Sequence, residues 1–165
     1  MEAFASLFAF AIATSAHAQL AAGLQPAKVD DIFGATQACL RAARPGIVDE
    51  AVLRAGSWKA ATMSANGKTV VSPLRVYGRE GGRALIVFAN AGTARGLCTV
   101  MARVARANSI GEVAGALERG LKARPAEVKP DRVTWFVPGK LVILQAAGSA
   151  ETPSIRIGVQ TAPKR

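Results

Sequence analysis

Residues 29–43 read Val-Asp-Asp-Ile-Phe-Gly-Ala-Thr-Gln-Ala-Cys-Leu-Arg-Ala-Ala, and their spacing is that of an amphipathic helix. Asp30 and Asp31 fall in the first turn, where the helix dipole favours negative charge. Positions three and four residues apart lie on one helical face, which here consists of Ile32, Thr36, Cys39, Leu40 and Ala43. We expect this face, with its cysteine, to pack on a β-sheet.

Residues 97–104 (Leu-Cys-Thr-Val-Met-Ala-Arg-Val) alternate in a way that predicts a strand, with Cys98 on its apolar face beside Val100, Ala102 and Val104. The chain has two cysteines, and neither belongs to a Cys-x-x-Cys zinc motif. In an oxidising compartment we expect a Cys39–Cys98 disulfide, which would set this strand under the first helix. A bridge closing a loop of about 60 residues stabilises a fold by roughly 4 kcal/mol in the chain-entropy model. The alternative is two buried thiols that never meet.

The remaining pattern predicts a second main helix at about 109–122 and a series of strands. Asn66-Gly67 and Pro138-Gly139 are turn signals between consecutive strands, so the sheet should be mainly antiparallel. We therefore expect an α+β fold, in which a sheet of about six or seven strands carries two main helices (about 29–43 and 109–122) on one face. The expected strands are 58–64, 69–77, 84–90, 97–104, 132–137, 140–147 and 154–160.

The start of the chain has the pattern of a signal peptide. Residues 3–13 form a short apolar run, and Ala16-His17-Ala18 fits the small-x-small site of signal peptidase. We expect residues 1–18 to be removed, 19–27 to form a flexible lead-in, 28–160 to form a single α+β domain and 161–165 to be a frayed tail. The prediction is a periplasmic or secreted protein with no membrane span after cleavage. The alternative is an uncleaved segment that anchors the chain.

Signal cleavage would leave little catalytic chemistry. It removes His17, the only histidine, and with it histidine-based triads and histidine metal sites. We predict no catalytic residue, metal site or cofactor, and we favour a protein that is not an enzyme. The adjacent acids Asp30–Asp31 and Asp49–Glu50 point in different directions on a helix. A carboxylate-dependent hydrolase acting on cell-wall or polysaccharide material stays as an alternative, and it needs two distant acids to meet in the fold.

Positive charge is the strongest functional signal. Lysine and arginine number 21 against 11 acids, for a net charge of +10. Arginine suits bidentate contacts with phosphate or carboxylate, so the expected partner is an anionic lipid, lipopolysaccharide or an acidic protein. The candidate anion-binding residues are Arg75, Arg79, Arg83, Arg103, Arg106, Arg119 and Lys122. The alternative is that genome composition alone accounts for the arginine excess.

Two further predictions concern the macromolecules that the protein binds. Nucleic acid is not expected, because the aromatic residues lie at strand positions that read as core: Trp58, Tyr77, Phe88, Trp135 and Phe136. A third alternative is a subunit of an envelope assembly or homo-oligomer. Such a subunit would pair through an exposed strand edge near Pro73 or at residues 154–160.

Overall fold

The computed structural model describes residues 24–62, 64–65, 68–69, 71–89, 96–107 and 109–161. Its three helices are α2 (Val29–Ala42), α3 (Glu50–Ala55) and α4 (Ser109–Leu121). The main sheet contains β3 (Lys59–Ala60), β6 (Leu74–Gly78), β7 (Ala84–Ala89), β8 (Cys98–Arg103), β9 (Glu127–Lys129), β10 (Arg132–Val137), β11 (Lys140–Gly148) and β12 (Pro153–Thr161). Two small hairpins are formed by β1 (Ala43–Arg44) with β2 (Ile47–Val48) and by β4 (Ser64–Ala65) with β5 (Lys68–Thr69).

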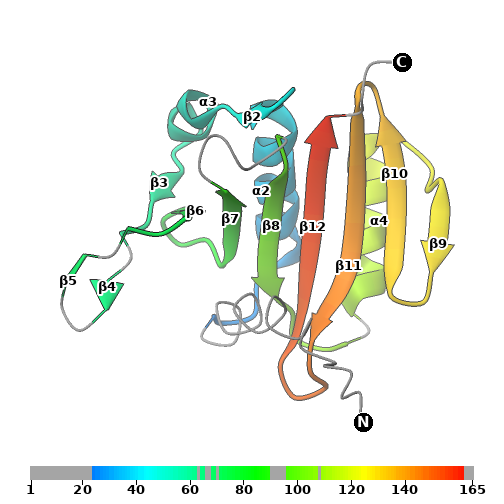
Figure 1. Cartoon of the computed structure of the whole chain (residues 1–165). Helices are drawn as coiled ribbons and strands as arrows, with labels where there is room; N and C mark the ends of the chain where they lie inside the picture. Colours follow the sequence, from blue (N-terminus) through cyan, green and yellow to red (C-terminus); the bar gives the residue numbers. More distant parts are fainter. Residues whose placement is uncertain are drawn as a thin grey trace, which may run out of the picture.

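The main sheet has eight antiparallel strands in the order β3-β6-β7-β8-β12-β11-β10-β9. The α+β architecture is therefore confirmed, with a slightly wider sheet than expected. The additional strand is β9, which has only three residues and no alternating pattern long enough to be recognised. Figure 1 shows α2 and α4 lying behind the sheet, so both main helices cover the same face.

The core lies between these helices and the inner face of the sheet. The predicted face of α2 is confirmed, because Ile32, Thr36, Cys39 and Ala43 are buried and Leu40 packs against the core. The predicted face of β8 is also confirmed, because Cys98, Val100 and Ala102 are fully buried. Other fully buried residues of this core include Val113, Leu117, Trp135, Leu144 and Ile157.

The disulfide between Cys39 and Cys98 joins α2 to the first residue of β8 across a Cα–Cα distance of 5.5 Å. Gly96 allows the chain to enter β8 at this point. Its φ is +67°, and a Cβ atom there would collide with the carbonyl oxygen of Arg44. Gly96 therefore lies directly against the β1–β2 hairpin that follows α2.

The structure corrects one expectation about strand edges. Residues 154–160 are not an edge, because β12 lies in the middle of the sheet between β8 and β11. Pro73 lies just before β6 rather than inside a strand, and β3 pairs only with Tyr77 and Gly78 at the other end of β6. The true edges are β3, with two residues, and β9, with three. Both are short and carry charged residues, which disfavours pairing with another chain.

The predictions about turns and about buried aromatic residues are confirmed at some positions and wrong at one. Strands β4 and β5 pair on either side of residues 66 and 67, which themselves lie outside the described residues. The Pro138-Gly139 turn is confirmed, because Val137 pairs with Lys140. Four of the five aromatic residues are buried, but Phe136 is 64% exposed on the outer face of β10. Phe136 is exposed because it alternates with the buried Trp135 along the strand.

We predict that the Cys39→Ser/Cys98→Ser double variant loses up to about 4 kcal/mol of unfolding free energy, because the bridge restricts the unfolded chain. Urea denaturation of the oxidised protein and of the variant measures the difference. A reducing agent should destabilise the parent chain by a similar amount and leave the variant unaffected. A difference below about 1 kcal/mol would show that the bridge contributes little.

Candidate anion-binding surface

The seven basic residues singled out in the sequence do not converge on one site. Arg75 lies on β6, opposite α3, whereas Arg79 and Arg83 lie at the turn between β6 and β7. Arg103 ends β8, and Arg106 is exposed in the segment between β8 and α4. Arg119 and Lys122 lie at the C-terminal end of α4. The partners of these basic residues are therefore described separately for each part of the fold.

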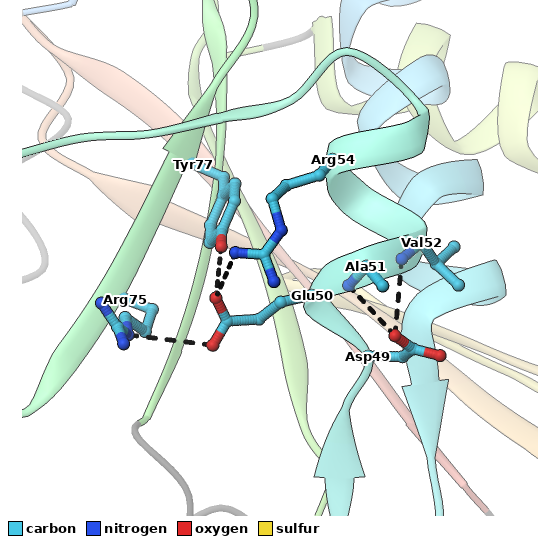
Figure 2. A network of polar contacts seen from close by, with 7 residues as sticks. All are labelled: Asp49, Glu50, Ala51, Val52, Arg54, Arg75 and Tyr77. Carbon is cyan, nitrogen blue, oxygen red and sulfur yellow. Dashed lines mark hydrogen bonds and ion pairs between the residues drawn. The ribbon is translucent and has the colours of Figure 1, made fainter.

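Arg75 belongs to a polar network around Glu50, shown in Figure 2. Asp49 caps α3 by accepting hydrogen bonds from the backbone N–H groups of Ala51 and Val52. Glu50 follows in the first turn. Its Oε1 lies 3.8 Å from Nε of Arg75, and its Oε2 lies 3.6 Å from Nη1 of Arg54. This carboxylate offsets part of the charge of both arginines, so we do not assign Arg75 to a free anion site.

Tyr77 is the buried member of this network. Its ring stacks on Phe88, with the ring centroids 5.7 Å apart, and its hydroxyl donates a hydrogen bond to Oε2 of Glu50. Burial raises the pKa of the phenol above its ordinary value, and the hydrogen bond to Glu50 and the charge of Glu50 raise it further. The network therefore fixes α3 against β6.

Arg83 and Arg103 bind the segment that leads into α2. Nη1 of Arg83 donates to the carbonyl oxygen of Pro26 at 3.2 Å, and Nη1 of Arg103 donates to that of Leu24 at 3.4 Å. The backbone N–H of Ala27 also donates to the carbonyl of Arg103 at 2.8 Å. These arginines have a structural role in holding the entry to α2.

Arg79 faces acids. It lines a hollow of about 340 Å³ together with Asp30, Asp31, Glu80 and Trp58. This hollow is the place where distant acids meet, as a carboxylate-dependent hydrolase requires. None of the three acids is buried, however, and Glu80 also pairs with Lys59 at 3.3 Å. A general acid with a raised pKa depends on burial, so the hollow does not favour hydrolysis.

Arg119 and Lys122 have different surroundings. Together with Arg124 they surround a second hollow, of about 360 Å³, whose other lining residues are Gly115, Glu118 and Ala123. The absence of a side chain at Gly115 makes room for Arg119, whose Nη1 lies 3.4 Å from the position that a Cβ would take. We call this the basic hollow.

The basic hollow carries more positive charge than its surroundings neutralise. No ion pair among the described residues involves any of its three cations. The C-terminus of α4 contributes about half a negative charge, and Glu118 contributes one more. Three cations against this total leave an excess of between one and two positive charges, roughly the charge of a phosphate group.

Two basic residues that are not among the seven candidates, Arg124 and Lys140, also make contacts of interest. Arg124 follows the end of α4, and only the folded chain shows that it shares a hollow with Arg119. Nζ of Lys140 donates to the carbonyl oxygen of Ala43, the residue that directly follows α2. Burial lowers the pKa of Lys140, and the nearby charge of Arg44 lowers it further. No local sequence motif predicts this contact, because 97 residues separate Lys140 from Ala43.

Within the described ranges, no group of three or more histidine, cysteine or acidic residues is arranged to hold a metal ion. In the same ranges, no helix is long and apolar enough to cross a membrane. The chain matches no protein-family model, and no curated protein or solved structure shows detectable similarity to it. Any functional assignment must therefore come from the residues themselves.

We predict that Tyr77, the only tyrosine, titrates above pH 10.0, because burial and Glu50 both disfavour its ionised form. The absorbance of tyrosinate as the pH rises measures this directly. Glu50→Gln should bring the midpoint back toward the ordinary value, and an unchanged midpoint would contradict the role of Glu50.

The same shift has a consequence for stability. The unfolded chain releases the phenolic proton first, so the contribution of Tyr77 is complete below about pH 10 and is lost as the pH rises through the folded pKa. Unfolding measurements across the alkaline range should show a shallower decline for Tyr77→Phe than for the parent chain.

Proposed function

We propose that this chain is an exported, non-catalytic binding protein whose basic hollow receives phosphate groups of an anionic envelope component. The single observation that carries the proposal is the convergence of Arg119, Lys122 and Arg124 on one hollow without an ion-pair partner among the described residues. Phosphate groups are common to anionic lipid and to lipopolysaccharide, and guanidinium groups bind them in a bidentate manner.

Export is supported by two independent features. The apolar run at 3–13 followed by Ala16-His17-Ala18 has the form of a cleaved signal peptide. The Cys39–Cys98 disulfide is of the kind that persists in oxidising compartments such as the periplasm. A periplasmic or secreted location would bring the basic hollow into contact with envelope phosphates.

The backbone at Lys122 also supports a functional use of the hollow. Lys122 has a φ of +52° at the end of α4, a conformation that usually requires glycine or asparagine. A lysine there costs about 1 kcal/mol relative to glycine. Retention of a cation at a strained position is expected if the charge contributes to binding, because strain of this kind gathers at functional sites.

The alternatives have weaker support. Hydrolysis lacks a buried acid among the residues that line the hollow of Asp30, Asp31 and Glu80. Assembly through strand edges is opposed by the short, charged edges of the sheet. The acidic-protein partner is kept as an outcome of the experiment below.

We predict that the protein binds vesicles containing phosphatidylglycerol, or lipopolysaccharide, and that salt weakens the binding by screening. Arg119→Gln/Arg124→Gln should weaken vesicle binding about thirtyfold, since each cation near an anionic surface contributes about 1 kcal/mol. The matched control is Lys28→Gln/Lys68→Gln, which removes the same net charge from exposed positions elsewhere. Vesicle co-sedimentation and lipopolysaccharide retention distinguish the two phosphate sources.

Equal losses in the two double variants would show that net charge alone drives the binding, and the proposal would fail. It would also fail if polyglutamate bound more tightly than either phosphate source, because the partner would then be an acidic protein.

We further predict that Lys122→Gly raises the unfolding free energy by about 1 kcal/mol and still weakens vesicle binding. The stability gain comes from relieving the left-handed backbone, and the binding loss comes from removing a cation. Thermal unfolding and co-sedimentation measure the two effects separately. A variant that is stabilised and binds as well as the parent chain would place Lys122 outside the binding surface.

A further inference from the structure

The outer face of the sheet carries none of the three helices of the described chain. Strand register assigns its residues, because Gly158 pairs with Ile143 on one side and with Thr99 on the other. The alternate residues of β12, Ile155, Ile157 and Val159, are buried on the inner face. Figure 1 shows β8, β12 and β11 side by side with both long helices behind them.

A hollow of about 320 Å³ opens on this face around Gly158, where β12 has no side chain. Ile143 and Thr99 flank it across the sheet, and Arg156 and Gln160 flank it along β12. Leu97, which is 42% exposed, and Gln145 complete its lining. The volume falls at the lower end of the range of about 300–1,000 Å³ for small-molecule sites.

Arg156 supplies this hollow with a positive charge. Its Nη2 donates to Oε1 of Gln145 at 2.7 Å, which orients the guanidinium group and leaves its other donors without a hydrogen-bond partner among the described residues. Among the described residues, no carboxylate forms an ion pair with Arg156. Arg132, which pairs with Gln145 from the other side of β11, instead binds Glu127 at 2.9 Å. The hollow therefore combines one uncompensated arginine with an apolar surface formed by Leu97 and Ile143.

The apolar surface continues sideways from the hollow. Leu141 pairs with Gln160 on one side and with Phe136 on the other, and Phe136 is 64% exposed. An exposed aromatic ring beside a partly apolar hollow is typical of a surface that contacts a hydrophobic ligand.

We propose that this hollow binds a single-chain amphiphile with an anionic head group. The head group binds the free donors of Arg156, and the hydrocarbon chain lies over Gly158 between Ile143 and Leu97. Charge complementarity selects the anionic head, and the apolar walls select the chain. This site is separate from the basic hollow, because the two share no lining residue.

Gly158→Val tests the shape of the site. A Cβ at Gly158 lies 3.5 Å from Cδ1 of Leu97, an ordinary contact, and valine favours a strand, so the variant should fold and fill the hollow. The matched control is Gly78→Val, since Gly78 is also a strand glycine of the outer face and its Cβ position lies 3.7 Å from Leu85. Arg156→Gln tests the charge, because it removes the guanidinium group and keeps a polar side chain at this position.

The probes are octanoate, octyl phosphate and the neutral octyl glucoside, each below its micelle concentration and measured by calorimetry. We expect both anions to bind the parent chain and the Gly78→Val control. Arg156→Gln should weaken them by about tenfold or more, and Gly158→Val should abolish binding. The Arg119→Gln/Arg124→Gln variant should bind octanoate normally, so failure of the basic hollow would not affect this result.

Three results would overturn the proposal. The first is the absence of octanoate and octyl phosphate binding to the parent chain. The second is binding of octyl glucoside as tight as that of the anions, which would remove the role of charge. The third is unchanged anion binding in Arg156→Gln, which remains decisive even if Gly158→Val does not fold. A preference for octanoate over octyl phosphate would identify a fatty acid rather than a single-chain phosphate ester as the source.

Discussion

The Cys39–Cys98 bridge joins the last turn of α2 to the first residue of β8, and the arrangement of the other elements depends on that junction. It holds the helix over the inner face of the sheet, where Ile32 and Ala35 of α2 are buried. The strand that it anchors lies beside β12, whose inner residues complete the same core. On the outer face, Val76, Val87 and Met101 form a second buried cluster, and the hollow around Gly158 lies beside it.

Some of the basic residues bind other parts of the chain, and others lack a carboxylate partner among the described residues. Arg75 faces Glu50, Arg83 and Arg103 hold the entry to α2, and Lys140 caps the end of that helix. Each of these cations has a partner that accounts for its position. The cations of the basic hollow and Arg156 have no carboxylate partner among the described residues, which is why the binding proposals rest on them.

The two proposed sites make different physical demands on a ligand. The basic hollow is exposed and highly charged, so its attraction acts over a distance and weakens with salt. The hollow at Gly158 has a single arginine and apolar walls, so contact area contributes more to binding there. In the two proposals, the first site attracts the protein to an anionic surface and the second holds one amphiphile.

Local patterns were sufficient to predict much of the fold. The spacing of Ile32, Thr36 and Cys39 predicted the buried face of α2, and the alternation around Cys98 predicted that of β8, because periods of 3.6 and 2 residues follow from backbone geometry alone. With only two cysteines, the pairing followed as well. The sequence also determined the excess of positive charge, but not how that charge is distributed over the surface.

The tertiary structure decided which residues meet. It placed residues 154–160 in the centre of the sheet rather than at an edge, since strand order depends on contacts between distant segments. It brought Leu97 to Gly158, and it left Phe136 exposed. The hollow at Gly158 combines side chains from β8, β11 and β12, and its geometry depends on long-range packing that no local period encodes.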